Sequence, residues 1–108
     1  MNQAKLERVR ALIELEVRPE EQNGFDRAAG RIFRHDNVID HYLISGRYDF
    51  LIIVESDSIT GISEFVSNQL APLKSIRSIT THFILKRYKV NGVLLDDTNT
   101  RDRLSVTP

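Results

Sequence analysis

The stretch Ser45–Glu55 reads SGRYDFLIIVE and joins a polar turn directly to five apolar residues. A strand with one face in water alternates apolar and polar side chains, and Phe50–Val54 does not. Alternate residues of a strand point to opposite sides, so Leu51 and Ile53 face away from their three apolar neighbours. Both faces of this strand therefore need an apolar cover.

The composition is that of one ordinary globular domain. The chain has 108 residues, 41% hydrophobic and 28% charged, which allows one core and argues against disorder. Fifteen basic side chains balance fifteen acidic ones, so the chain has no broad positive field for binding duplex DNA or RNA. The lack of cysteine excludes disulfides, thiolate metal sites and cysteine nucleophiles. Without a long apolar run or a signal region, we expect a soluble cytoplasmic protein with no membrane contact.

Strand-like and helix-like patterns alternate along the chain. Val9–Val17 places apolar residues at every second position, which predicts a strand. Two later stretches, one after Gly24 and one from Ile59 to Leu70, repeat apolar residues at helical spacing. The remaining strands are expected at Val38–Ile44, Tyr48–Glu55 and Ile76–Tyr88.

The order β-α-β-β-α-β predicts an α+β, ferredoxin-like fold with a four-stranded antiparallel sheet. Its first and third strands are central, and two helices cover only one face of the sheet. Leu51 and Ile53 on the third strand would face away from those helices. No remaining segment is apolar enough to cover them, so we expect a second copy of the chain, packed sheet against sheet. Full burial of an aliphatic side chain contributes ~1.5–3 kcal/mol, which favours a dimer interface at these two residues.

The turn Ser45–Asp49, with its Gly-x-Tyr-Asp motif between the second and third strands, resembles a known module. This element order and motif are similar to the effector-binding (RAM) domain of the Lrp/AsnC family of transcription regulators. The resemblance runs from about Val9 to Lys89, and Ser78–Leu85 is similar to the family's final strand. It implies a ligand-sensing and oligomerisation domain that binds an amino acid or related small metabolite between subunits. It also implies an α+β barrel-like homodimer, or a tetramer or octamer.

The resemblance divides the chain into a linker remnant at 1–8, an effector-binding domain at 9–89, and a hairpin and tail at 90–108. Family members usually begin with a helix-turn-helix domain, so DNA contact is expected only through a separate or missing domain of that kind. A stand-alone protein and the C-terminal part of a longer regulator both fit. In the last segment, Asn91-Gly92 suits the positive φ angles of a type I′ hairpin turn.

The turn and the last strand supply the candidate ligand-binding residues. Gly46 exposes backbone N–H groups that could hold a carboxylate, while Asp49 would meet an ammonium group. The alternative is a plain hairpin turn in which Asp49 only accepts hydrogen bonds from loop amides. Tyr48 either lines the pocket or packs at its rim. Thr80 and Thr81 offer hydroxyls on opposite faces of a strand, although Thr is common in strands for packing reasons; the resemblance favours Thr81. The candidates are Ser45, Gly46, Arg47, Tyr48, Asp49, Thr80 and Thr81.

No catalytic site, metal site or cofactor is expected. Of the three histidines, His41 and His82 fall on the second and fourth strands, the two edges of the predicted sheet. The sequence has no serine at a nucleophile elbow, no phosphate-binding loop and no dinucleotide fingerprint. Two alternatives stay open, because fold alone does not define function. One is a small dimeric α+β barrel enzyme that resembles cofactor-free monooxygenases, and the other is a pure assembly module.

Overall fold

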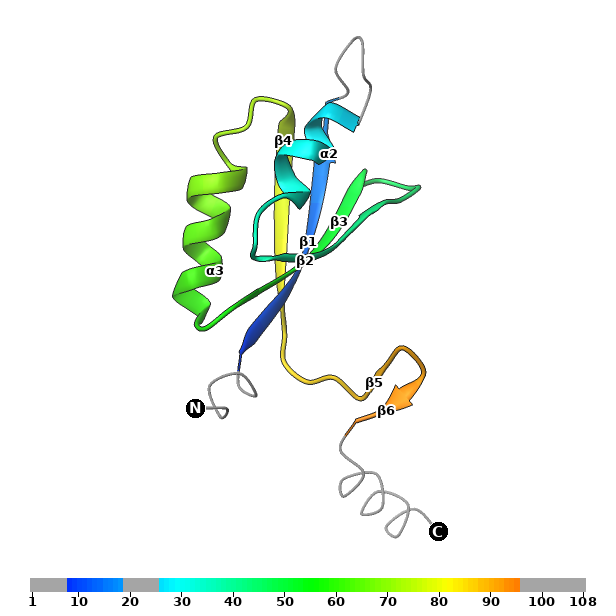
Figure 1. Ribbon diagram of the computed structural model, residues 1–108. Coiled ribbons are helices and arrows are strands. Elements are labelled where there is room, and N and C mark those ends of the chain that lie inside the picture. The colour runs from blue at the N-terminus through cyan, green and yellow to red at the C-terminus, as the bar shows by residue number, and fades with distance from the viewer. Residues whose placement is uncertain (1–7, 19–25, 96–108) are drawn as a thin grey trace, which may run out of the picture.

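The computed structural model describes residues 8–18 and 26–95, with the side chains of 26–28 left out. The expected linker remnant, apart from Arg8, and the tail beyond Leu95 lie outside the described residues. Figure 1 shows the elements in chain order. They are β1 (Val9–Val17), α2 (Asp26–Phe33), β2 (Val38–Leu43), β3 (Phe50–Ser56), α3 (Ile59–Phe65), the π-helical turn η1 (Val66–Leu70), β4 (Ile76–Ile84), β5 (Lys89–Val90) and β6 (Val93–Leu94).

The main sheet has four antiparallel strands in the order β2-β3-β1-β4. The two central strands are therefore β1 and β3, as the ferredoxin-like prediction requires, and the fold class is confirmed. Ile13 at the centre of β1 lies opposite Ile52 on one side and Thr81 on the other.

One face of the sheet forms the core together with the helices. Buried residues alternate with partly exposed ones along both β1 and β3, which is the pattern of strands with a single fully covered face. Figure 1 shows α2 and α3 lying on that covered side. The core consists of Ala11, Ile13, Leu15, Val17, Ile32, Phe50, Ile52, Val54, Ile62, Phe65 and Leu70.

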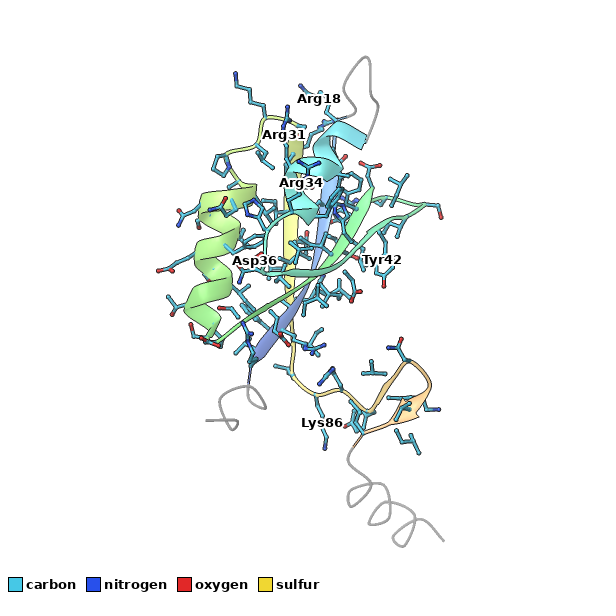
Figure 2. The ribbon with its side chains drawn as sticks, viewed as in Figure 1. Arg18, Arg31, Arg34, Asp36, Tyr42 and Lys86 are labelled. Carbon is cyan, nitrogen blue, oxygen red and sulfur yellow. The ribbon has the colours of Figure 1, made fainter. Side chains whose placement is uncertain are left out.

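The opposite face of the sheet is left open by the helices. The register places Leu12 of β1 beside Ile53 of β3, and Glu14 beside Leu51. Leu51 also lies opposite Tyr42 of β2, which is labelled in Figure 2 and is half exposed. The side chains of Leu12, Leu51 and Ile53 are only partly buried in the single subunit. The strand β3 therefore carries an apolar side that its own chain leaves uncovered.

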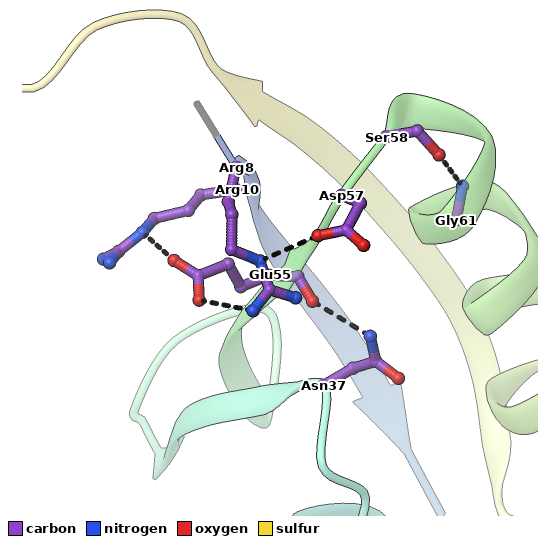
Figure 3. Close-up of polar contacts among 7 residues, drawn as sticks. All are labelled: Arg8, Arg10, Asn37, Glu55, Asp57, Ser58 and Gly61. Atoms are coloured by element: carbon purple, nitrogen blue, oxygen red, sulfur yellow. Dashed lines mark hydrogen bonds and ion pairs between the residues drawn. The ribbon is translucent and has the colours of Figure 1, made fainter. Parts of the chain in front are cut away.

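A polar cluster holds the beginning of β1 to the end of β3 (Figure 3). Glu55 accepts a hydrogen bond of 2.7 Å from Arg10 Nε and lies 3.7 Å from Arg8. Arg8 also pairs with Asp57 at 3.4 Å, and Asn37 donates to the backbone oxygen of Glu55 at 2.9 Å. These pairs are partly exposed to solvent, and ion pairs at the surface contribute only about 0–1 kcal/mol each. We therefore infer that this cluster aligns the ends of β1 and β3 and contributes only a small part of the stability of the domain.

The start of α3 follows the capping rule for helices. The Ser58 side chain accepts a hydrogen bond of 2.9 Å from the Gly61 amide, which satisfies one of the first unpaired N–H groups of the helix. The helical stripe predicted from Ile59 to Leu70 is confirmed at its buried members Ile62, Phe65 and Leu70. Ile59 is instead 58% exposed, because it stands at the first position of the helix, beyond the edge of the core.

The predicted C-terminal hairpin is confirmed as β5 and β6. Asn91 and Gly92 at its tip have φ angles of 51° and 78°, both positive as a type I′ turn requires. In Figure 1 this hairpin lies away from the four-stranded sheet, joined to β4 by an extended segment. No helix within residues 8–18 and 26–95 is both long and apolar enough to cross a membrane.

Candidate functional site

The candidate turn lies in the six-residue segment 44–49 that links β2 to β3. It is closed by the Ile44 amide, which donates to the Asp49 oxygen at 2.9 Å. Gly46 has a φ angle of 111°, a conformation that residues with a Cβ atom rarely adopt. The Arg47 guanidinium lies over the Tyr48 ring, 5.8 Å from its centroid, within the range of a cation–π contact. The loop therefore depends on glycine and presents a cation and a phenol next to each other.

Asp49 fastens the turn to the end of β1. Its amide donates to the Leu15 oxygen at 3.0 Å, and its Oδ2 accepts from the Val17 amide at 2.8 Å. A hydrogen bond to a charged acceptor contributes about 1.5–3 kcal/mol, so the carboxylate has a structural role. The amide that it binds belongs to β1 rather than to the loop. This anchoring leaves the negative charge in place at the mouth of the turn.

The turn and the last strand meet on the open face of the sheet. The Tyr48 hydroxyl lies 3.3 Å from Thr80 Oγ1, and both residues are partly buried. Thr80 is opposite Glu14, an open-face position, whereas Thr81 is opposite Ile13 in the core. The structure thus brings Tyr48 and Thr80 together and places Thr81 on the other face, as the alternation of the strand predicts.

Thr81 lines a separate groove between β4 and the second helix. The groove has a volume of about 250 Å³, slightly below the ~300–1,000 Å³ of sites for drug-sized molecules. Its lining combines hydroxyl groups with apolar side chains: Ile62, Ser63, Val66, Ser67, Thr81 and Phe83. The helix there turns into η1, with the Ala71 amide donating to the Val66 oxygen at 2.8 Å, and such π turns are frequent at functional sites. We did not predict Ser63 and Ser67 from the sequence. Their i, i+4 spacing next to Ile62 and Val66 places the two hydroxyl groups on one face of a helix, and this pattern could have identified them.

The histidines do not form a shared site. His41 of β2 lies between two aromatic rings, with centroids 4.6 Å from Phe50 and 6.2 Å from Phe33. Both of its ring nitrogens are buried without a hydrogen-bond partner among the described residues, and burial lowers the pKa of His41 below its usual 6.5. His82 instead lies on the opposite edge strand, 3.4 Å from Glu14. Within the described part of the chain, no group of His, Asp and Glu side chains is placed to hold a metal ion.

The burial of His41 predicts a loss of stability in mild acid. Its lowered pKa means that the unfolded chain binds the proton more readily, so the free energy of unfolding falls as the pH drops below about 6.5. Replacing His41 with phenylalanine keeps a ring of similar shape and removes the titration. We expect chemical denaturation of the wild type between pH 7.5 and 5 to show a steeper loss of stability than that of His41→Phe. Equal slopes for the two proteins would contradict this role of His41.

The comparison with known sequences gives a family match. Residues 10–94 match the sequence model of the Lrp/AsnC ligand-binding domain, so the match extends beyond Lys89 into the hairpin. An uncharacterized HTH-type transcriptional regulator of Bacillus subtilis, YugG, is 40% identical over 102 residues. The alignment covers 94% of this chain and 61% of that relative. The chain therefore spans about three fifths of the length of the relative.

Solved structures share the same fold at lower identity. AsnC of Escherichia coli has a TM-score of 0.68 at 20% identity, over 77% of this chain and 54% of its own. An AsnC family regulator of Agrobacterium tumefaciens has a TM-score of 0.72 at 19% identity, over 91% and 64%. The regulator NMB0573 of Neisseria meningitidis, solved in complex with L-Met, has a TM-score of 0.68 at 19% identity, over 83% and 58%. On the family match, the chain belongs to the Lrp/AsnC ligand-binding domains, a family of transcription regulators and not of enzymes.

Proposed function

We propose that this domain senses an amino acid or a related small metabolite at a subunit interface and oligomerises as part of an Lrp/AsnC-type regulator. The contact between the Tyr48 hydroxyl and Thr80 Oγ1 carries the proposal, because it joins the motif of the turn to the last strand. The complex of NMB0573 with L-Met supports an amino acid as the ligand of a domain with this fold.

The chemistry of the turn suits the two charged groups of a free amino acid. The backbone at Gly46 and the guanidinium of Arg47 would bind the carboxylate, and Ser45 adds a hydroxyl. The Asp49 carboxylate would meet the ammonium group, with Thr80 completing the polar wall. A charge-assisted hydrogen bond is about twice as strong as a neutral one, so Arg47 and Asp49 should contribute more to the affinity than the neutral groups of the site.

A second subunit would complete the site. Ser45, Gly46 and Arg47 are exposed in the single subunit, whereas ligand sites usually enclose most of the ligand surface. The groove at Thr81 lies on the other face of β4 and would receive a different neighbouring subunit. This arrangement fits a homodimer that assembles further into a tetramer or octamer. We assign residues 9–89 to sensing. DNA contact would come from a separate helix-turn-helix domain.

We expect that Asp49→Asn weakens an amino-acid ligand by ~1.5–3 kcal/mol, the range for a charged hydrogen bond, or about tenfold to more than a hundredfold. The change removes the negative charge, while the amide oxygen of asparagine can still accept from Val17. A thermal-shift screen of the twenty amino acids identifies the ligand as a saturable stabiliser, and calorimetry then measures its affinity for both proteins.

Glu55→Gln is the matched control, since it neutralises a partly buried carboxylate at the other end of β3. The affinity of this variant should stay at the wild-type value. If Asp49→Asn instead lowers the melting temperature and leaves the affinity unchanged, the carboxylate is purely structural. A screen without any stabilising amino acid would favour a pure assembly module.

Substitution of Gly46 should act on stability rather than on charge recognition. At a φ angle of 111°, Gly46→Val forces a β-branched residue into a disfavoured region, which costs about 1–3 kcal/mol. The melting temperature should therefore fall with and without ligand. Gly30→Ala in α2 is the comparison, because an added Cβ there meets no atom within 4 Å and alanine favours helices.

A further inference from the structure

A small pocket lies where β1 begins and β4 ends. Arg10 of β1 is opposite Ile84, the last residue of β4, and beyond it the chain leaves the sheet (Figure 1). The pocket has a volume of about 150 Å³. Its lining consists of Arg8, Arg10, Ile84, Leu85, Lys86 and Arg87. Four of these six side chains are cationic and none is acidic, so the pocket is a candidate anion site.

Two carboxylates orient the arginines of β1 without using all of their donors. Glu55 lies 2.7 Å from Arg10 Nε and 3.7 Å from Arg8 Nη1, and Asp57 lies 3.4 Å from Arg8 Nε (Figure 3). A guanidinium has five N–H donors in a planar fork. Each arginine is therefore held in place by a carboxylate and keeps further donors for an anion in the pocket.

The third arginine adds a positive charge that these carboxylates do not balance. Arg87 is exposed and has no ion-pair or hydrogen-bond partner within residues 8–18 and 26–95. The three arginines outnumber the two carboxylates, so the cluster is positive even before Lys86 is counted. Like charges around one small space repel each other, and a bound anion would relieve that repulsion.

The size of the pocket and the type of its donors select the class of anion. A water molecule takes up ~30 Å³ of liquid, so the pocket has room for about five of them. It is smaller than the ~300–1,000 Å³ of sites for drug-sized ligands, and it suits one compact group. The arginine fork binds carboxylate and phosphate through paired N–H···O bonds. A carboxylate has two oxygens, whereas a terminal phosphate offers three, one for each arginine.

We propose that this pocket binds the terminal phosphate of a small metabolite, as a second ligand site of the domain. Arg10 and Val17, whose amide holds Asp49, are roughly 23 Å apart along β1 at ~3.3 Å per residue. The pocket is thus separate from the turn, and the inference does not depend on the proposed amino-acid ligand. Duplex DNA is a less suitable source of the phosphate, because its binding needs many phosphate contacts and the chain has no net charge.

The first test titrates the full-length chain with inorganic phosphate, with chloride keeping the ionic strength constant. Nuclear magnetic resonance of the backbone amides should show saturable shifts around Ile84 and Arg87. We expect Arg87→Gln to raise the dissociation constant roughly tenfold or more, as for the loss of a charged hydrogen bond. Arg77→Gln is the matched control, since it removes the same charge from an exposed position at the other end of β4. An equal loss in both variants, or shifts that do not saturate, would overturn the site.

The second test identifies the source of the phosphate. A nucleoside monophosphate should compete with inorganic phosphate, whereas its cyclic phosphodiester, which lacks a terminal phosphate, should compete more weakly. A short duplex DNA should bind neither the wild type nor Arg87→Gln. If the duplex bound, lost affinity in Arg87→Gln, and the monophosphate did not compete, the arginines would contact a nucleic-acid backbone. That result would overturn the assignment to a small metabolite.

Discussion

Ile53→Asp is expected to separate the proposed dimer or to prevent the chain from folding. Ile53 lies beside Leu12 on the open face and is only partly buried within its own subunit. In a sheet-on-sheet dimer the new carboxylate would be enclosed without a partner. An uncompensated buried charge costs about 3–5 kcal/mol, which corresponds to a more than hundredfold weaker dimer at 1.4 kcal/mol per factor of ten.

Light scattering coupled to size exclusion measures this effect directly, with circular dichroism as the check on folding. Ile53→Val is the control, since it keeps a β-branched apolar side chain and should change the dimer only slightly. A soluble Ile53→Asp dimer with unchanged stability would show that the open face is not the interface. The apolar side of β3 would then need another explanation.

Much of the fold could be predicted because it follows from local periodicity. The uninterrupted Phe50–Val54 run identified a central strand, and two-residue alternation placed Thr80 and Thr81 on opposite faces, as observed. Likewise Asn91-Gly92 specified a turn whose φ angles are both positive. In each case the physical cause lies within a few residues of the signal.

The features that sequence reasoning missed depend on contacts between distant segments. Asp49 binds the amide of Val17, 32 residues away, and no local pattern specifies that partner. The burial of His41 between Phe33 and Phe50 depends on how α2 lies on the edge strand. The groove at Thr81 exists because the helix ends in a π turn opposite β4. The sequence could identify candidate residues. Which of them lie together depends on how the sheet and the helices pack.

Phe50→Ala should destabilise the domain more than any substitution in the turn that precedes it. The Phe50 side chain is 1% exposed, lies opposite Leu15 in the register, and touches the ring of His41. Truncation of a buried phenylalanine costs about 3–5 kcal/mol, because transfer energy is lost and a cavity remains. Since small domains are stable by only about 5–15 kcal/mol, a large part of the total stability would be lost.

The position of Phe50 also makes this substitution a test of how the site is held in place. It directly follows Asp49, so the core anchors the turn through one peptide bond, and loss of that anchor should reduce ligand affinity and stability together. Asp49→Asn should instead reduce affinity with a smaller loss of stability than Phe50→Ala, because the asparagine oxygen can still accept from the Val17 amide. Urea unfolding measures the free energy of unfolding of each variant. Phe50→Leu keeps much of the apolar volume, so its free energy of unfolding should fall clearly less than that of Phe50→Ala. A fall of less than ~1 kcal/mol in the free energy of unfolding of Phe50→Ala would contradict this expectation. The covered face of β3 would then not be the core that positions the turn, because the cavity left by a phenylalanine ring always has a cost in a close-packed interior.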